Sequence, residues 1–177
     1  MEYLFYIFDL DGTLSPTDQE VLYPDAAKWL EANHHNWVIC TNQGGIGLRL
    51  WMEKGGFGDP GKYSTLEKFS DRLDKLFPWI DRENRIYYVL MCTAYQSKKT
   101  GQWAPTPPSG VGYAMWNQDW RKPAPGMLIH AMAIRGFIPA KTLMVGDSLD
   151  DQGAAQAAGV DFQPAWQFFG RPEEKLR

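Results

Sequence analysis

The sequence predicts an α/β fold, in which helices cover both faces of a doubly wound parallel sheet within one domain of residues 1–177. Three observations indicate this fold. First, the apolar runs are short and continuous, as in strands that are buried on both faces. Second, segments with helical periodicity separate these runs. Third, polar residues follow the end of each run. A chain of 177 residues with 44% hydrophobic and 22% charged residues suits one core and is ordinary for a globular protein.

Four apolar runs are the predicted strands of the sheet. The first is continuously apolar and aromatic, without the alternation of a strand that has one solvated face. In chain order the runs are Tyr3–Phe8, Trp37–Thr41, Ile86–Met91 and Thr142–Val145. A shorter apolar stretch at 160–162 follows the last predicted helix.

The predicted helices lie between these strands and carry start and stop signals. We expect helices over 24–33, 64–77, 125–135 and 151–158. Pro24 stands near the first turn of the first helix, and Ser64 with Glu67 forms a capping-box pattern that opens the second. Gly136 ends the third helix. Residues 42–63 are rich in glycine, have no clear period and are expected to be irregular.

Charge and cysteine content exclude several classes of function. A net charge of −3 gives the whole chain no general attraction for nucleic acid. No apolar run is long enough to span a membrane, and the first residues lack the basic start and apolar segment of a signal peptide. Cys40 and Cys92, the only cysteines, fit no metal-ligand spacing and are expected to be free, buried thiols. These features predict a cytoplasmic protein.

Polar residues follow the carboxyl ends of the predicted strands, where open α/β sheets bind their ligands. They are Asp9, Asp11, Thr41, Asn42, Asp147 and Asp151. Asp9 and Asp11 lie one residue apart, and Gly12 lets the backbone turn sharply after them. Two neighbouring carboxylates repel each other unless a cation neutralises them or they divide the work between them. An acidic turn after a strand is the simpler interpretation of these residues taken alone.

Four segments carry a resemblance to a known family. They are "DLDGTL" at 9–14, "CTNQGGIG" at 40–47, "RKPAPGML" at 121–128 and "GDSLDD" at 146–151. Because these four segments occur in this order, the chain resembles the haloacid dehalogenase (HAD) superfamily of aspartate-nucleophile phosphatases, which have a Rossmann-like sheet. The second and third segments further resemble the branch that contains histidinol-phosphate phosphatase, heptose-bisphosphate phosphatase and the polynucleotide 3′-phosphatases.

The resemblance implies roles for the acidic residues. Asp9 would be the nucleophile that forms an aspartyl-phosphate, and Asp11 would be the general acid and then the general base. Asp9, Asp147, Asp151 and the carbonyl group of Asp11 would hold Mg²⁺ through hard oxygen ligands. Asp150 could replace or assist Asp151, but the spacing favours Asp151.

The resemblance also implies the residues that bind the phosphoryl group. Thr41 and the backbone amides that follow it, in Asn42, Gln43 and Gly44, would bind its oxygens, and Asn42 would help to orient them. Lys122 would pair with the phosphoryl group and with Asp9 as negative charge develops. Taken singly, Thr41 could be an ordinary strand residue and Lys122 a solvated loop lysine. Their occurrence together favours the functional interpretation.

The segment 92–122 is the expected substrate loop. It has no period, it is too short for a large cap domain, and loops of this length are usually functional. It contains Tyr95, Lys98, Lys99, Trp103, Tyr113, Trp116 and Trp120, which could stack a base and hold its backbone or could pack the loop onto the protein. Many heptose-bisphosphate phosphatases carry a zinc loop of cysteine and histidine here, whereas this chain has only Cys92.

The function expected from these residues is Mg²⁺-dependent hydrolysis of a phosphomonoester, either a small phosphorylated metabolite or an exposed phosphate end. A polynucleotide 3′-phosphatase is the alternative within enzymes, with a nucleic-acid end as substrate. Two other classes are a catalytically idle module that binds phosphate or metal, and a receiver domain phosphorylated on aspartate. A receiver domain would leave a general acid two residues after its acceptor unexplained. The oligomeric state is left open.

Overall fold

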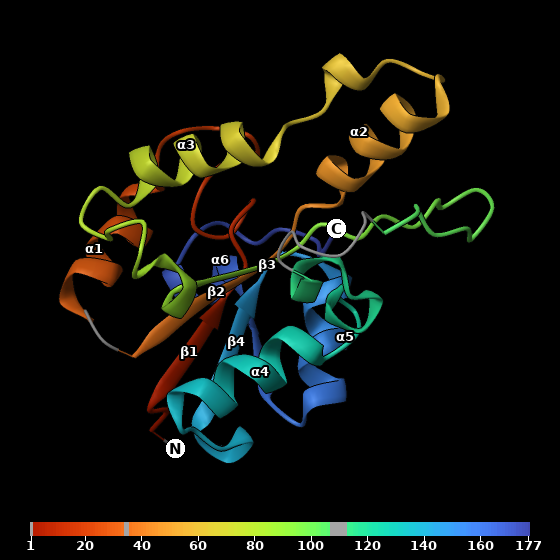
Figure 1. Ribbon diagram of the computed structural model, residues 1–177. Helices are drawn as coiled ribbons and strands as arrows, with labels where there is room; N and C mark the ends of the chain where they lie inside the picture. The colour runs from red at the N-terminus through yellow and green to blue at the C-terminus, as the bar shows by residue number, and fades with distance from the viewer. Residues whose placement is uncertain (1, 34–35, 107–112) are drawn as a thin grey trace.

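The structure, a computed structural model, describes residues 2–33, 36–106 and 113–177. Its centre is a five-stranded sheet in which every pairing is parallel, with the strand order β3-β2-β1-β4-β5 (Figure 1). The strands are β1 (Phe5–Phe8), β2 (Trp37–Asn42), β3 (Val89–Cys92), β4 (Thr142–Gly146) and β5 (Asp161–Pro164). The predicted α/β fold with a parallel sheet is therefore confirmed.

Helices cover both faces of this sheet, as a doubly wound fold requires. They are α1 (Pro24–Ala32), α2 (Gly44–Gly55), α3 (Leu66–Leu76), α4 (Gly126–Arg135), α5 (Leu149–Ala158) and α6 (Ala165–Phe169). Side chains of α1, α3 and α6 form one buried core with the sheet, and side chains of α4 and α5 form the other. Within the described ranges no helix is both long and apolar enough to cross a membrane.

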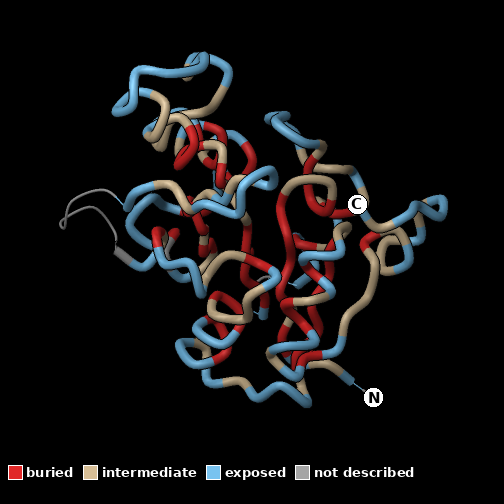
Figure 2. The backbone as a smooth tube through the Cα atoms, turned by 90° about the vertical axis from the view of Figure 1, so that its right-hand side faces the viewer, coloured by how far each residue is buried: buried red, intermediate tan, exposed pale blue. Residues whose placement is uncertain are grey.

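The continuous apolar runs of the strands follow from burial on both faces. In β1, Phe5 and Ile7 contribute to the core beneath α4 and α5, while Phe8 contributes to the opposite core. In β2, Val38 and Ile39 divide between the two cores in the same way. Figure 2 shows the buried backbone concentrated in the strands and in the helix turns that touch them. A strand without a solvated face has no position for regular polar alternation.

Helix α2 lies within 42–63, which the sequence led us to expect as irregular. Glycine has a low helix propensity, and α2 begins and ends with glycine. Packing accounts for it: a Cβ on Gly47 would lie 2.2 Å from the carbonyl oxygen of Thr93. Ile46 and Leu48 of the same turn are buried. Glycine lets this turn approach the segment after β3, at a position where no other residue fits.

Several element boundaries differ from the predicted ones by one to three residues, and three of these differences have a clear structural cause. Thr65, not Ser64, caps α3, because its hydroxyl accepts from the Lys68 amide at 3.1 Å, and the predicted capping box with Glu67 does not form. The third strand begins at Val89, since Arg85–Tyr87 form a 3₁₀ turn. Helix α5 begins at Leu149, two residues earlier than predicted, because Ser148 is its N-cap.

The connections that could hold a cap domain are short in the described part of the chain. The link from β1 to β2 contains α1, and the link from β3 to α4 contains 3₁₀ turns at Tyr113–Trp116 and Gln118–Trp120. Residues 107–112 and the side chain of Tyr113, both part of the expected substrate loop, lie outside the described residues.

Three tryptophans of the 92–122 segment pack onto the protein. Trp116 is buried in the core beneath α3, and Trp103 and Trp120 are partly buried against the core beneath α4 and α5. Trp120 also contacts the ring of His130 on α4, with ring centroids 5.0 Å apart. For these residues the structure supports the packing interpretation over base stacking.

Candidate active site

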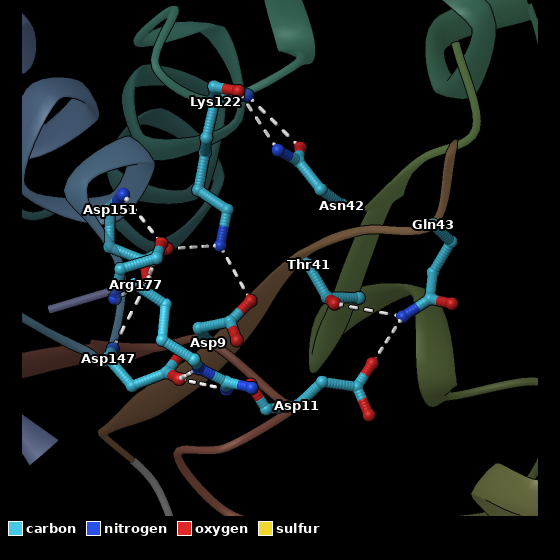
Figure 3. A network of polar contacts seen from close by, with 10 residues as sticks. Asp9, Asp11, Thr41, Asn42, Gln43, Lys122, Asp147, Asp151 and Arg177 are labelled. Atoms are coloured by element: carbon cyan, nitrogen blue, oxygen red, sulfur yellow. Dashed lines mark hydrogen bonds and ion pairs between the residues drawn. The ribbon is translucent and has the colours of Figure 1, made fainter. Parts of the chain in front are cut away.

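A buried lysine joins two carboxylates at the carboxyl end of the sheet. The Nζ atom of Lys122 lies 2.6 Å from Oδ1 of Asp9 and 2.6 Å from Oδ1 of Asp151 (Figure 3). Asp9 follows β1 directly, Lys122 precedes α4, and Asp151 lies in the first turn of α5. Lys122 and Asp151 are 2% and 1% exposed, so this network is shielded from solvent. Residues distant in the sequence therefore meet where the parallel strands end.

Burial sets the electrostatics of this network. It raises the pKa of Asp9 to about 7, and the charges of Asp151 and Asp147 add to the rise while Lys122 opposes it. Burial acts to lower the pKa of Lys122, but the carboxylates of Asp151 and Asp9 outweigh it and hold that pKa above its ordinary value. Lys122 is therefore a fixed positive charge, and Asp9 needs a further cation to be fully ionised near neutral pH.

Asp151 uses both of its carboxylate oxygens within the protein. While Oδ1 accepts from Lys122, Oδ2 accepts from the Ser148 hydroxyl at 2.6 Å and from the amides of Ser148 and Asp147 at 3.1 and 3.2 Å. The Ser148 side chain in turn accepts from the Asp151 amide, which completes a capping box at the start of α5. Asp151 thus fixes the loop after β4 and the ammonium group of Lys122. Asp150, by contrast, is exposed on the wall of the cleft.

The carboxylates of Asp9, Asp147 and Asp151 could together hold a divalent cation. One oxygen from each lies within 4.8 Å of the others. Among the described residues no group donates a hydrogen bond to Oδ2 of Asp9, whereas both oxygens of Asp151 accept hydrogen bonds. Hard carboxylate and carbonyl oxygens are the ligands that Mg²⁺ prefers. The donor set therefore fits Mg²⁺, with Asp9 and Asp147 better placed to bind it than Asp151.

Arg177, which the sequence did not indicate as a site residue, brings a second cationic group to these carboxylates. The guanidinium of Arg177 pairs with Oδ2 of Asp147 through Nε and Nη2, and its Nη2 lies 3.2 Å from the carbonyl oxygen of Asp11. Two backbone bonds hold this end of the chain: Arg177 N–H donates to Asp147 O at 3.0 Å and Leu149 N–H to Arg177 O at 2.9 Å. Burial raises the pKa of Asp147, and Arg177 opposes that rise.

Asp11 is held at both carboxylate oxygens. Arg72 of α3 donates to Oδ1 at 2.7 Å, and the Gln43 side chain donates to Oδ2 at 2.9 Å. The backbone amide of Asp18 also reaches Oδ1, at 3.3 Å. The predicted sharp turn follows at Gly12, which has φ +88°, a conformation that favours glycine. A Cβ there would collide with the Asp147 carboxylate.

The residues expected to bind the phosphoryl group have several contacts within the protein. Asn42 exchanges two hydrogen bonds with the backbone of Lys122, at 2.9 and 3.1 Å. Gln43 donates its side-chain amide to Thr41 Oγ1 at 3.1 Å as well as to Asp11, and its backbone amide donates to the Cys92 carbonyl at 2.7 Å. Asn42 and Gln43 thus order the site, and the Gln43 backbone amide is not available to a phosphoryl oxygen.

A cleft of about 470 Å³ opens over these groups. Thr41 and Gly44 line it, and a Cβ on Gly44 would lie 2.6 Å from the Arg121 guanidinium. Its wall also carries the cationic side chains of Lys62, Lys98 and Arg121. A volume in this range suits a small ligand.

Comparison with known proteins finds similarity to HAD-like phosphatases. A profile described as HAD-hydrolase-like matches residues 119–162. The chain is 30% identical over 136 residues to the D-glycero-beta-D-manno-heptose-1,7-bisphosphate 7-phosphatase of Haemophilus ducreyi, covering 76% of this chain and 62% of that protein. It is 43% identical over 125 residues to the Vibrio cholerae protein of the same name, covering 70% of this chain and 54% of that protein. The chain is therefore similar to the HAD-like hydrolases.

The fold of the chain also matches a solved structure. The D,D-heptose 1,7-bisphosphate phosphatase of B. bronchiseptica, complexed with magnesium and phosphate, superposes with a TM-score of 0.53 at 21% identity. The match covers 92% of this chain and 79% of that one, and it shows the shared fold. The chain spans less than two thirds of the length of the curated relatives it matches.

Proposed function

We propose that this protein is a Mg²⁺-dependent phosphomonoester hydrolase that works through an aspartyl-phosphate on Asp9. One observation carries the proposal: the Asp9 carboxylate has one oxygen fixed by buried Lys122 and lies in a carboxylate cluster suited to a divalent cation. A carboxylate can attack an anionic phosphate ester only beside positive charge. Lys122 supplies part of that charge, and Mg²⁺ held by Asp9, Asp147 and the Asp11 carbonyl would supply the rest.

Asp9 and Asp11, the two aspartates after β1, then have different roles in a reaction with two successive displacements at phosphorus. A carboxylate oxygen of Asp9 bonds to phosphorus as the ester oxygen leaves, and Asp11 donates a proton to that oxygen. In the second step water attacks phosphorus, Asp11 takes its proton, and the bond to Asp9 breaks. Lys122 remains charged throughout and stabilises the carboxylate of Asp9 in the free enzyme.

The proposed substrate is a small phosphorylated metabolite. The cleft has the volume for one, and two curated relatives are named for a heptose bisphosphate. Heptose bisphosphate itself is not assigned, because the 92–122 segment contains a single cysteine, Cys92, instead of a zinc loop. We further propose that this segment is the substrate loop, because Lys98 brings a cation to the cleft wall. Packing of Trp103, Trp116 and Trp120 onto the protein weakens one of the observations that favoured a nucleic-acid end.

We also place the protein in the cytoplasm. Cys40 and Cys92 are free and buried, and burial raises the pKa of the Cys40 thiol to about 12 and that of Cys92 above its usual range. Thiols of this kind suit a reducing compartment.

Metal removal tests the proposal. With EDTA, turnover of aryl and sugar phosphates should fall by about 10²-fold or more, and Mg²⁺ should restore it. Without the metal, Lys122 alone compensates the negative charge of Asp9 and the phosphoryl oxygens. Ca²⁺ should restore little, since its larger, looser coordination misplaces the phosphoryl group. Initial rates on a panel of sugar phosphates and a 3′-phosphorylated oligonucleotide, each with chelator and with Mg²⁺, give the measurement.

The Arg177→Met variant tests whether the Asp147 carboxylate takes part in binding the metal. Arg177→Met removes the guanidinium from Asp147 and should lower the Mg²⁺ concentration that gives half-maximal rate. Arg82→Met, which removes an exposed arginine from a distant carboxylate pair, should leave that concentration unchanged. Undiminished turnover in EDTA would contradict the metal requirement, and a preference for the oligonucleotide would contradict the substrate class.

A further inference from the structure

We infer that Arg72 is a positioning residue for Asp11, and that the proton transfers made by Asp11 depend on it. The inference rests on the proposed function and concerns a residue for which the four motif segments assign no role. Arg72 lies on α3, 61 positions after Asp11 in the chain, yet its Nη2 atom lies 2.7 Å from Asp11 Oδ1. Its side chain is only 8% exposed, so water screens this ion pair weakly.

Arg72 also binds the loop that follows Asp11. Its Nε donates to the carbonyl oxygen of Gln19 at 2.6 Å, and its Nη2 reaches Ser15 Oγ at 3.2 Å and Pro16 O at 3.4 Å. Phe69 and Leu73 on the same helix are buried in the core, which gives the guanidinium a rigid support. The position of the Asp11 carboxylate is thereby tied to α3.

The second oxygen of Asp11 is fixed from the opposite direction by Gln43. Because Arg72 and Gln43 each donate to one of its oxygens, the Asp11 carboxyl group is confined to one orientation on the wall of the cleft. Asp18, whose amide also contacts Asp11, has φ +60°, an uncommon conformation outside glycine. The surroundings of Asp11 thus hold a defined geometry, and a shift of about 1 Å in a reacting group can cost about 10²-fold in rate.

A purely structural role is the competing explanation, because Arg72 ties α3 to the loop at 15–20 through Ser15, Pro16 and Gln19. The chain offers a matched control on the same helix. Lys75, three residues later, ties α3 to the same loop through Glu20 at 2.7 Å, is well exposed and has no contact with Asp11 in the described structure. Loss of Lys75 therefore reports what loosening this loop does by itself.

The experiment compares Arg72→Met with Lys75→Met on two classes of ester. If Arg72 acts through Asp11, Arg72→Met should slow aspartyl-phosphate formation from an alkyl phosphate by about 10²-fold. An aryl phosphate needs little protonation of its leaving group, so its first step should slow far less. Lys75→Met should leave the alkyl-to-aryl ratio of the wild type unchanged. Single-turnover rates with Mg²⁺ give these ratios.

A double-mutant cycle with Asp11→Asn completes the test. In the Asp11→Asn background, Arg72→Met should change the alkyl rate by no more than about twofold, because the group that it positions is already lost. Equal losses for both esters, or losses that multiply in the double variant, would overturn the inference. If Arg72→Met does not fold, Arg72→Lys decides: it should show the same selective loss for the alkyl ester, and a uniform loss would overturn the inference. A wild type inactive on both esters would instead overturn the proposed function.

Discussion

Asp9→Asn is expected to lose about 10⁴-fold or more of phosphomonoester hydrolysis while keeping its fold. An amide is a poor nucleophile, so the covalent step has no substitute at this position. The amide oxygen can still accept from Lys122, and the change removes a buried charge, so the native packing should persist. Rates with Mg²⁺, together with thermal unfolding followed by circular dichroism, measure both effects.

The control for this variant is Asp18→Asn, which removes an exposed carboxylate from the wall of the same cleft. It should keep most of the activity, because the Asp18 contact with Asp11 comes from its backbone amide. Near wild-type turnover by a folded Asp9→Asn protein would remove Asp9 from the mechanism.

Lys122→Met is expected to impair both stability and rate. It leaves the carboxylates of Asp9 and Asp151 buried without their shared cation, which typically costs about 3–5 kcal/mol of unfolding free energy. Loss of a fixed charge beside the reacting phosphoryl group should lower kcat by about 10²–10³-fold. Urea unfolding in EDTA and in Mg²⁺ should show the larger destabilisation in EDTA, because the metal replaces part of the missing charge.

Lys98→Met serves as the control, since Lys98 is an exposed lysine of the cleft wall. Its unfolding free energy should match the wild type in both buffers. If the Lys122→Met protein were as stable as the wild type in EDTA, Lys122 would not be the cation that compensates the buried carboxylates of Asp9 and Asp151.

The convergence of the acidic residues could be predicted because it depends on topology. Once the strands were identified, Asp9 and Asp147 had to meet at the carboxyl edge of a parallel sheet. The fold class followed from the same apolar runs. Both inferences need only the order of the elements and the point at which each strand ends.

The supporting contacts could not be predicted, because they depend on packing across the chain. Arg72 lies between Phe69 and Leu73 on the apolar face of α3, where a buried charge implies a partner, but the sequence does not show that Asp11 is that partner. Nothing in the sequence indicates that Arg177 reaches Asp147. Helix α2 was not predicted because its glycines have a low helix propensity. In the structure, close packing of Gly47 against Thr93 outweighs that propensity.

The capping residues show the same limit on a smaller scale. Ser64 and Thr65 are both good N-caps, and their neighbours in space decide between them in favour of Thr65. Asp151 could be a metal ligand or a helix-capping residue by spacing alone. In the structure its oxygens are occupied by Lys122 and by the amides at the start of α5.

The stereochemical course at phosphorus tests the central claim, a covalent intermediate on Asp9, most directly. Each in-line displacement inverts the configuration, so attack by Asp9 followed by attack of water gives two inversions. With a substrate made chiral at phosphorus by oxygen isotopes and sulfur, and with Mg²⁺ present, the account predicts net retention in the released thiophosphate. The result does not require the intermediate to accumulate. Net inversion would show direct attack by water and would contradict the account.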